Sequence, residues 1–275
     1  MNTEILEPPR SSGSTIPRRR SLAALLAPLG RMATASGSLL KRSAGRFELD
    51  GEDYELPRYV FHGPAGGGDP LRIGIFAAIH GDEPEGAAGL ISFVQQLVRN
   101  PAIARGYVLF LYPVCNPTGY EDGTRSSRRG HDLNREFWNN TREPEVLLLQ
   151  DELCTHAFHG LIALHSDDTS HGLYGFVSGA TLTKNLLEPA LKASEQFLPR
   201  NDDAVIDGFN ARNGIIRQGY RGILKAPPKV HPRPFEIVFE TPQHAPQFLQ
   251  EKALVVALHS ILTEYRKVIS YAANI

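Results

Sequence analysis

The chain has 275 residues, of which 41% are hydrophobic and 21% charged, and its 29 basic side chains nearly balance 30 acidic ones. This length suits one large globular domain, and the net charge of −1 gives no electrostatic reason to expect a nucleic-acid partner. Cys115 and Cys154 are too few for a disulfide framework. No apolar stretch is long enough to predict a transmembrane helix. A nucleic-acid-binding protein, a disulfide scaffold and a membrane-spanning chain are therefore disfavoured.

Residues 1–45 are predicted to form an N-terminal tail. Arginines at 18–20, a short apolar run and an Ala-x-Ala pattern at 33–35 resemble a secretory signal, but Pro28 and Arg31 interrupt the apolar run. We therefore expect a cytoplasmic protein, with export as the alternative. The other interpretation is a disordered segment to about residue 20, followed by a short amphipathic helix that packs on the domain through leucines at 22, 25, 26 and 29.

From residue 46 onward, predicted strands alternate with predicted helices. Alternating apolar and polar residues around Asp50–Gly51 indicate a hairpin. Buried strands are predicted at "LRIGIFAAI", "GYVLFLYPVCNP", "GLIALHS", "LYGFVS" and "FEIVFET", and helices over 84–99, 143–158, 181–198 and 245–270. The segments 117–142 and 199–234 are predicted to be irregular. Residues 46–275 are thus expected to form a single α/β domain with helices on both faces of its sheet.

Polar residues follow several of these strands at the point where each strand ends. His80 follows "IFAAI", Asn116 follows "YPVC", His165 follows "LIAL" and Glu240 follows "FEIVF". The carboxyl ends of parallel strands form the ligand crevice of open α/β sheets. We therefore expect these four segments to contribute to one site.

His80 and Glu83 lie three residues apart in "HGDE", a spacing that lets two side chains point the same way. Imidazole and carboxylate groups are usual zinc ligands, and a catalytic zinc needs three protein ligands and an open position. His165 is the candidate for the third ligand. The alternative is an ordinary strand-end turn in which Asp82 caps the following helix, with His165 a satisfied core or surface histidine.

The loop 116–137 is rich in arginine. Its basic side chains either form a solvated face, or they bind a carboxylate and stabilise a developing oxyanion. Glu240 closes an apolar strand, where a glutamate is costly to bury unless it is paired or works as a base. A base beside a metal-activated water is what hydrolysis of an amide requires.

The order of these motifs resembles that of the zinc carboxypeptidase superfamily, including its succinylglutamate desuccinylase and aspartoacylase branch. The resemblance covers about residues 70–242 and rests on "HGDE", "NPTGY…GTR…DLNREF", the strand-end His165, and Glu240 followed by Thr241. It implies an α/β fold with a mixed, mostly parallel central sheet, and one catalytic Zn²⁺ per chain bound by His80, Glu83 and His165.

The resemblance also implies roles for the remaining polar residues. Asn134 and Arg135 would bind a carboxylate of the substrate next to the scissile amide. Arg125 would polarise the carbonyl and stabilise the oxyanion, with Arg128 as the competing candidate for that role. Glu240 would be the general base. A further residue of the family's site, a tyrosine that caps the substrate, has Tyr220 in "RQGYRG" as its candidate.

The implied activity is hydrolysis of an amide bond adjacent to a free carboxylate. Only one predicted helix follows Glu240, and without the C-terminal β domain typical of the desuccinylases and aspartoacylases the expectation is a metallocarboxypeptidase or small peptide amidase. The alternative is an N-acyl amino acid deacylase of that branch, and the less favoured one is a non-catalytic carboxylate-binding protein. The expected partner is a small-molecule or peptide substrate, not a nucleic acid.

Overall fold

The computed structural model describes residues 19–272. Residues 1–18, which include the start of the signal-like stretch and most of the segment expected to be disordered, lie outside the described residues. The leucine-rich part forms the helix α1 (Leu22–Ala35), and the side chain of its N-cap Ser21 accepts a hydrogen bond from the backbone N–H of Ala24. Leu29 is buried in the main hydrophobic core. The expected amphipathic helix is therefore present and packs on the domain.

The predicted hairpin is formed by β1 (Leu39–Leu49) and β2 (Glu52–His62), which pair antiparallel. Asp50 and Gly51 connect them with φ angles of 54° and 76°. Positive φ at both central residues is typical of a two-residue hairpin turn. Because β1 begins at Leu39, the sheet starts ahead of the boundary predicted at residue 46.

Parallel strands form the centre of the sheet. In the spatial order β4 (Tyr107–Tyr112), β3 (Leu71–Ala77), β5 (Gly160–Asp167) and β10 (Phe235–Pro242), each strand pairs parallel with the next. On one side β2 pairs antiparallel with β4, and on the other β6 (Tyr174–Val177) pairs antiparallel with β10. The sheet is thus mixed, as expected, with its parallel part at the centre.

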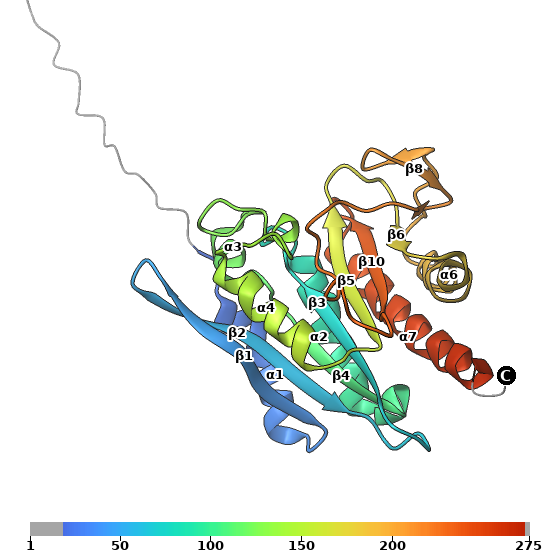
Figure 1. The fold of residues 1–275 in the computed structure, drawn as a ribbon, viewed down its shortest axis with the longest axis horizontal. Helices are drawn as coiled ribbons and strands as arrows, with labels where there is room; N and C mark the ends of the chain where they lie inside the picture. Colours follow the sequence, from blue (N-terminus) through green and yellow to red (C-terminus); the bar gives the residue numbers. More distant parts are fainter. Residues whose placement is uncertain (1–18, 273–275) are drawn as a thin grey trace, which may run out of the picture.

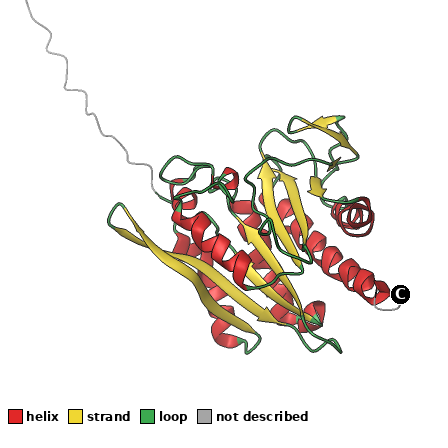
Figure 2. Ribbon diagram, in the orientation of Figure 1, coloured by secondary structure: helices red, strands yellow, loops and turns green. Residues whose placement is uncertain are grey.

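Helices cover both faces of the sheet (Figures 1 and 2). On one face, α2 (Pro84–Arg99) and α7 (Gln247–Ala272) pack beside α1 into the larger core cluster. On the other face, α4 (Pro144–Thr155) packs through Val146 and Leu149 into a second cluster. None of the described helices has the length and apolar character needed to cross a membrane.

The close packing of α2 depends on small residues. A Cβ atom on Gly86 would lie 2.9 Å from the backbone oxygen of Leu164 in β5, and one on Gly89 would lie 2.7 Å from Leu254 in α7. Pro84 occupies the start of the helix and Glu85 its first turn, where a proline and an acidic side chain are favoured. This packing fixes the start of α2, and therefore Glu83, against β5.

Three segments differ from the sequence prediction. The helix expected over 181–198 is divided into α5 (Ala180–Leu182), a π-helical turn at Thr183–Leu187 and α6 (Glu188–Ser194). Pro189 lies at the start of α6, where its missing N–H cannot continue the ladder of hydrogen bonds from the preceding turn.

The segment 199–234, expected to be irregular, contains the short strands β7 (Val205–Ile206), β8 (Phe209–Arg212) and β9 (Ile215–Ile216). They extend the sheet to the order β1-β2-β4-β3-β5-β10-β6-β9-β8-β7. The segment 117–142 also holds regular structure, namely α3 (Pro117–Asp122) and a 3₁₀ turn at Leu133–Arg135.

Candidate active site

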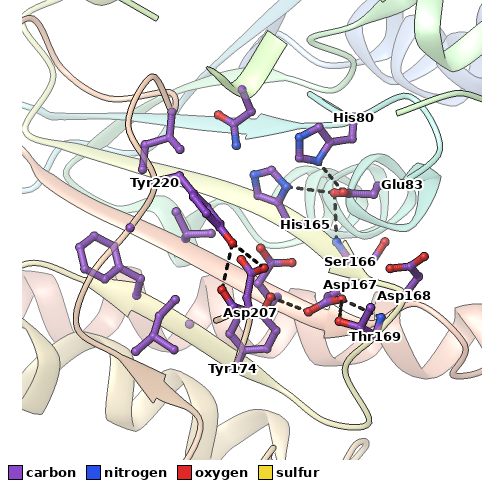
Figure 3. A pocket seen from close by; sticks show the side chains of 18 of the residues that line it. His80, Glu83, His165, Ser166, Asp167, Asp168, Thr169, Tyr174, Asp207 and Tyr220 are labelled. Atoms are coloured by element: carbon purple, nitrogen blue, oxygen red, sulfur yellow. Dashed lines mark hydrogen bonds and ion pairs between the residues drawn. The ribbon is translucent and has the colours of Figure 1, made fainter. Parts of the chain in front are cut away.

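His80, Glu83 and His165 converge at the carboxyl ends of the central strands (Figure 3). His80 follows β3, Glu83 is the N-cap residue of α2, and His165 lies in β5. The Nδ1 atom of His80 is 2.5 Å from Oε1 of Glu83, and Nδ1 of His165 is 2.9 Å from Oε2 of Glu83. All three side chains are buried. Two separate strands and one helix start thus deliver three potential metal ligands to one point.

The three residues fit a metal ion. One ligand atom from each lies within 4.8 Å of the other two. Two imidazoles and a carboxylate are a donor set that zinc accepts in catalytic sites with three protein ligands. The other ring nitrogen of His80, Nε2, lies 3.1 Å from Oδ1 of Asp132. A carboxylate on the far nitrogen of a histidine fixes the orientation of the ring and is common behind metal-ligating histidines.

The electrostatics of the cluster also suit a cation. Burial disfavours the charged imidazolium of His80, but the carboxylates of Glu83 and Asp132 outweigh this effect and raise the pKa of His80 to about 8. Burial likewise opposes ionisation of Glu83, yet the two histidines lower the pKa of Glu83 to about 2. A site that attracts a proton this strongly is one where a divalent cation can replace that proton.

Glu240 stands next to this cluster. It lies in β10 directly opposite His165 of β5 in the parallel pairing. Burial, together with the nearby charge of Glu83, raises the pKa of Glu240 to about 8, although His165 acts in the opposite direction. A carboxylate whose pKa lies near neutral pH has the proton affinity that a general base needs.

A cavity of about 270 Å³ opens above these residues, and Asn134, Arg135 and Tyr220 line it. The Oδ1 atom of Asn134 accepts a hydrogen bond of 2.8 Å from the backbone N–H of Leu224, which holds the side-chain amide in place. The guanidinium of Arg135 lies 4.1 Å from the ring centroid of Tyr220, a cation–π contact. The hydroxyl of Tyr220 donates to Asp207 (Figure 3).

Arg125 also lines the cavity. Its Nη1 atom lies 3.3 Å from Nδ1 of His80 and 3.6 Å from Oε1 of Glu83, and its Nε and Nη2 atoms contact Oδ2 of Asp132 at 3.1 and 3.0 Å. A half-exposed guanidinium so close to the candidate metal ligands can reach an oxygen atom of a bound substrate.

Arg128 lies outside the cavity, contrary to the expectation that it could contact substrate. Its Nε and Nη2 atoms donate to Asp122 at 2.8 and 2.9 Å, and its Nη1 atom contacts Glu52 and Tyr54 of β2. These acidic and phenolic partners balance the positive charge of the guanidinium and accept its hydrogen bonds. An open cavity would offer the guanidinium fewer such partners. We therefore remove Arg128 from the candidate site, because, of these two arginines, it is Arg125 that lines the cavity.

The cavity has more acidic side chains than the sequence motifs indicated. Asp167 accepts a hydrogen bond of 2.8 Å from the hydroxyl of Tyr174. Asp82, Asp168 and Asp207 line the same cavity, and among the described residues none of these four aspartates forms an ion pair with a lysine or arginine. The sequence signal that could have identified one wall is "HSDD", in which two aspartates follow the candidate ligand and its neighbouring serine.

Comparison with known proteins agrees with this geometry. Residues 70–199 match the model of the succinylglutamate desuccinylase/aspartoacylase catalytic domain. That range includes all three candidate metal ligands and ends before Tyr220 and Glu240. No curated protein matches the chain.

Solved structures share the fold over most of the chain. A candidate metallopeptidase from Shewanella denitrificans OS217 is 24% identical, with a TM-score of 0.73 over 88% of this chain and 90% of the other. A metallo-carboxypeptidase from Burkholderia cenocepacia is 18% identical, with a TM-score of 0.69 over 91% and 70%. Bovine thrombin-activatable fibrinolysis inhibitor is 16% identical, with a TM-score of 0.67 over 90% and 98%. The family match over residues 70–199 and the shared fold agree with the resemblance to the zinc carboxypeptidase superfamily.

Proposed function

We propose that the protein is a zinc-dependent hydrolase that cleaves an amide bond adjacent to a free carboxylate. The observation that carries this proposal is the convergence of His80, Glu83 and His165 beside Glu240, within a cavity that Arg135 also lines. One ion per chain would be held by the two imidazoles and the carboxylate. When bound, zinc would supply Lewis acidity, which polarises a carbonyl group and makes water a stronger nucleophile.

The chain's own residues would carry the other parts of the reaction. Asn134 and Arg135 would bind the substrate carboxylate, and Arg135 would do so with two parallel N–H donors. Glu240 would take a proton from the attacking water and pass it to the leaving amine. Arg125 would stabilise the negative charge that develops on the carbonyl oxygen. Tyr220, stacked on Arg135, would cover the bound carboxylate and exclude water from it.

The charges in the cavity favour a peptide substrate over an N-succinyl amino acid. A succinylated amino acid presents a second carboxylate on the acyl side of the amide. The aspartates at 82, 167, 168 and 207 would repel that group, and Arg125 and Arg135 are the arginines that line the cavity and could compensate it. We therefore favour a metallocarboxypeptidase or small peptide amidase. The N-acyl deacylase type is the second candidate, supported by the family match over residues 70–199.

A hydrolysis screen of the zinc-loaded protein tests the proposal. Short peptides with a free C-terminal carboxylate, the same peptides with a C-terminal amide, and N-succinyl and N-acetyl amino acids would be compared. Cleavage of the free-carboxylate peptides and not of their amides is the expected result. Preferred cleavage of the N-acyl amino acids would favour the deacylase. Stoichiometric carboxylate binding without turnover of any substrate would favour a non-catalytic binding protein.

A further inference from the structure

Arg20, near the first described residue, contacts the loop that carries two of the candidate metal ligands. Its Nη1 atom donates a hydrogen bond of 3.0 Å to the backbone oxygen of Gly81. We propose that Arg20 is a positioning residue of the metal centre, which holds the turn between His80 and Glu83 in the conformation that presents both side chains to one ion. This inference rests on the proposed zinc-dependent function.

The turn at Gly81 is closely confined. The backbone N–H of Glu83 donates to the carbonyl oxygen of His80 at 3.2 Å, which closes the turn on one side. On another side the chain passes so near that a Cβ atom on Gly81 would lie 1.9 Å from the carbonyl carbon of Gly119. The hydrogen bond from Arg20 adds a cationic donor to the Gly81 carbonyl. A small rotation of this peptide would move both flanking ligands, so each contact that fixes it also fixes them.

Arg20 is itself anchored on helix α3, which precedes the loop that carries Arg125. Its backbone N–H donates to the carbonyl oxygen of Glu121 at 2.7 Å, and its guanidinium lies 5.8 Å from the ring centroid of Tyr120. The loop that follows α3 carries Arg125, which contacts His80. Arg20 therefore joins the loop with two candidate ligands to the helix that precedes the candidate oxyanion-stabilising arginine.

Helix α1 determines the position of Arg20. Its leucines at 22, 25 and 26 pack against a small cluster that includes Ala78, at the end of β3, and Tyr120. Ser21 caps the helix immediately after Arg20. Burial of these leucines therefore fixes the backbone of Arg20 next to the site. Because the backbone is already fixed, the hydrogen bond to Gly81 requires little additional loss of conformational freedom.

Zinc affinity measured by competition with a chelator tests this role, and Arg19 supplies a matched control. Arg19 is the neighbouring residue, but it pairs with Glu52 at 2.8 Å instead of contacting Gly81. We expect Arg20→Ala to weaken zinc binding about 10-fold, the lower end of the range for groups that orient metal ligands. Arg20→Lys, which keeps a cationic donor, should recover part of that loss. Arg19→Ala should bind zinc as the unmodified protein does.

Unchanged zinc affinity in Arg20→Ala, or an equal loss in Arg19→Ala, would overturn the role of Arg20. If Arg20→Ala does not fold, Arg20→Lys and Arg20→Gln carry the test. A decrease in zinc affinity in the order Arg, Lys, Gln supports the proposal, and equal affinities contradict it. An unmodified protein that binds no zinc would overturn both this role and the proposed function, whereas zinc binding with an unaffected Arg20→Ala overturns this role alone.

Discussion

Glu240 and His165 lie opposite each other in the parallel pairing of β10 with β5. Neighbouring parallel strands end at the same edge of a sheet, so a residue near the end of one strand is brought beside a residue near the end of the other. Side chains in a strand alternate between faces, and a shift of one residue in this register would turn one of the two away. The pairing of two apolar strands therefore positions the candidate base beside a candidate ligand.

Replacing Glu240 with glutamine should separate turnover from metal binding. Because Glu240 is the candidate base and not a ligand, Glu240→Gln should keep zinc while turnover falls by about 100- to 10,000-fold. Glu236→Gln on the same strand is the matched control, since Glu236 pairs with Arg233 at 3.1 Å. Steady-state kinetics and metal analysis of both variants provide the measurement. A Glu240→Gln enzyme with undiminished turnover would show that another group is the base.

Zinc should stabilise the folded protein through Glu83. A ligand at 100 times its dissociation constant adds about 2.7 kcal/mol to the free energy of unfolding when it binds only the folded state. We expect the melting temperature to rise with added zinc, to fall on chelation, and to be almost insensitive to zinc in Glu83→Gln. Calorimetry with and without zinc measures this, and equal responses in the two proteins would argue against Glu83 as a ligand.

Arg135 and Arg128 should respond differently to substitution. Loss of hydrogen bonds to a charged group costs about 1.5–3 kcal/mol, so Arg135→Ala should lower kcat/KM for a free-carboxylate substrate by about 10- to 100-fold. Arg128→Ala should change kcat/KM by no more than about 2-fold, because its partners lie outside the cavity. A similar decrease in kcat/KM in both variants would indicate that Arg128 does contribute to the active site.

Gly81 should not tolerate a side chain. An alanine Cβ would lie 1.9 Å from Gly119, so the loop must shift, and overpacking of this kind costs about 1–3 kcal/mol. We expect Gly81→Ala to lower both the free energy of unfolding, measured with urea, and the zinc affinity. Gly68→Ala is the control, since no atom of the part of the chain that the structure describes lies within 4 Å of its added Cβ. If Gly81→Ala binds zinc as tightly as the unmodified protein, the turn between His80 and Glu83 can shift without loss of zinc binding, and the prediction is wrong.

Glu145 should make stability depend on pH. It is buried, its Oε2 atom has no hydrogen-bond partner among residues 19–272, and burial raises its pKa above 4.5. The folded state therefore binds the proton more tightly than the unfolded state, and stability decreases as pH rises through the folded-state pKa. Glutamine resembles the protonated form.

Consequently, Glu145→Gln should gain stability relative to the unmodified protein at pH 7 and less at pH 4. Urea unfolding at both pH values measures the difference, with Glu48→Gln on the exposed side of β1 as the control. A gain that is equal at the two pH values would exclude a titration effect.

Much of the fold could be predicted because the relevant signals are local. The helix predicted over 84–99 is α2, and the strand at "GLIALHS" is β5, since apolar runs and a proline at a helix start identify such elements within a few residues. The split of the helix over 181–198 was missed, because Pro189 is compatible with the start of a helix as well as with an interruption of one.

The sequence by itself determined which reactive side chains lie at the strand ends. These side chains could be predicted because "HGDE", "DLNREF" and the strand-end His165 and Glu240 are short local patterns that follow one another in a characteristic order. Only the tertiary structure decided which polar groups meet. It turned Arg128 toward Glu52, brought Asp132 behind His80 and placed Arg20 on Gly81. The physical reason is that a charged side chain takes the partner that best compensates it, and each of these partners lies more than fifty residues away in the chain.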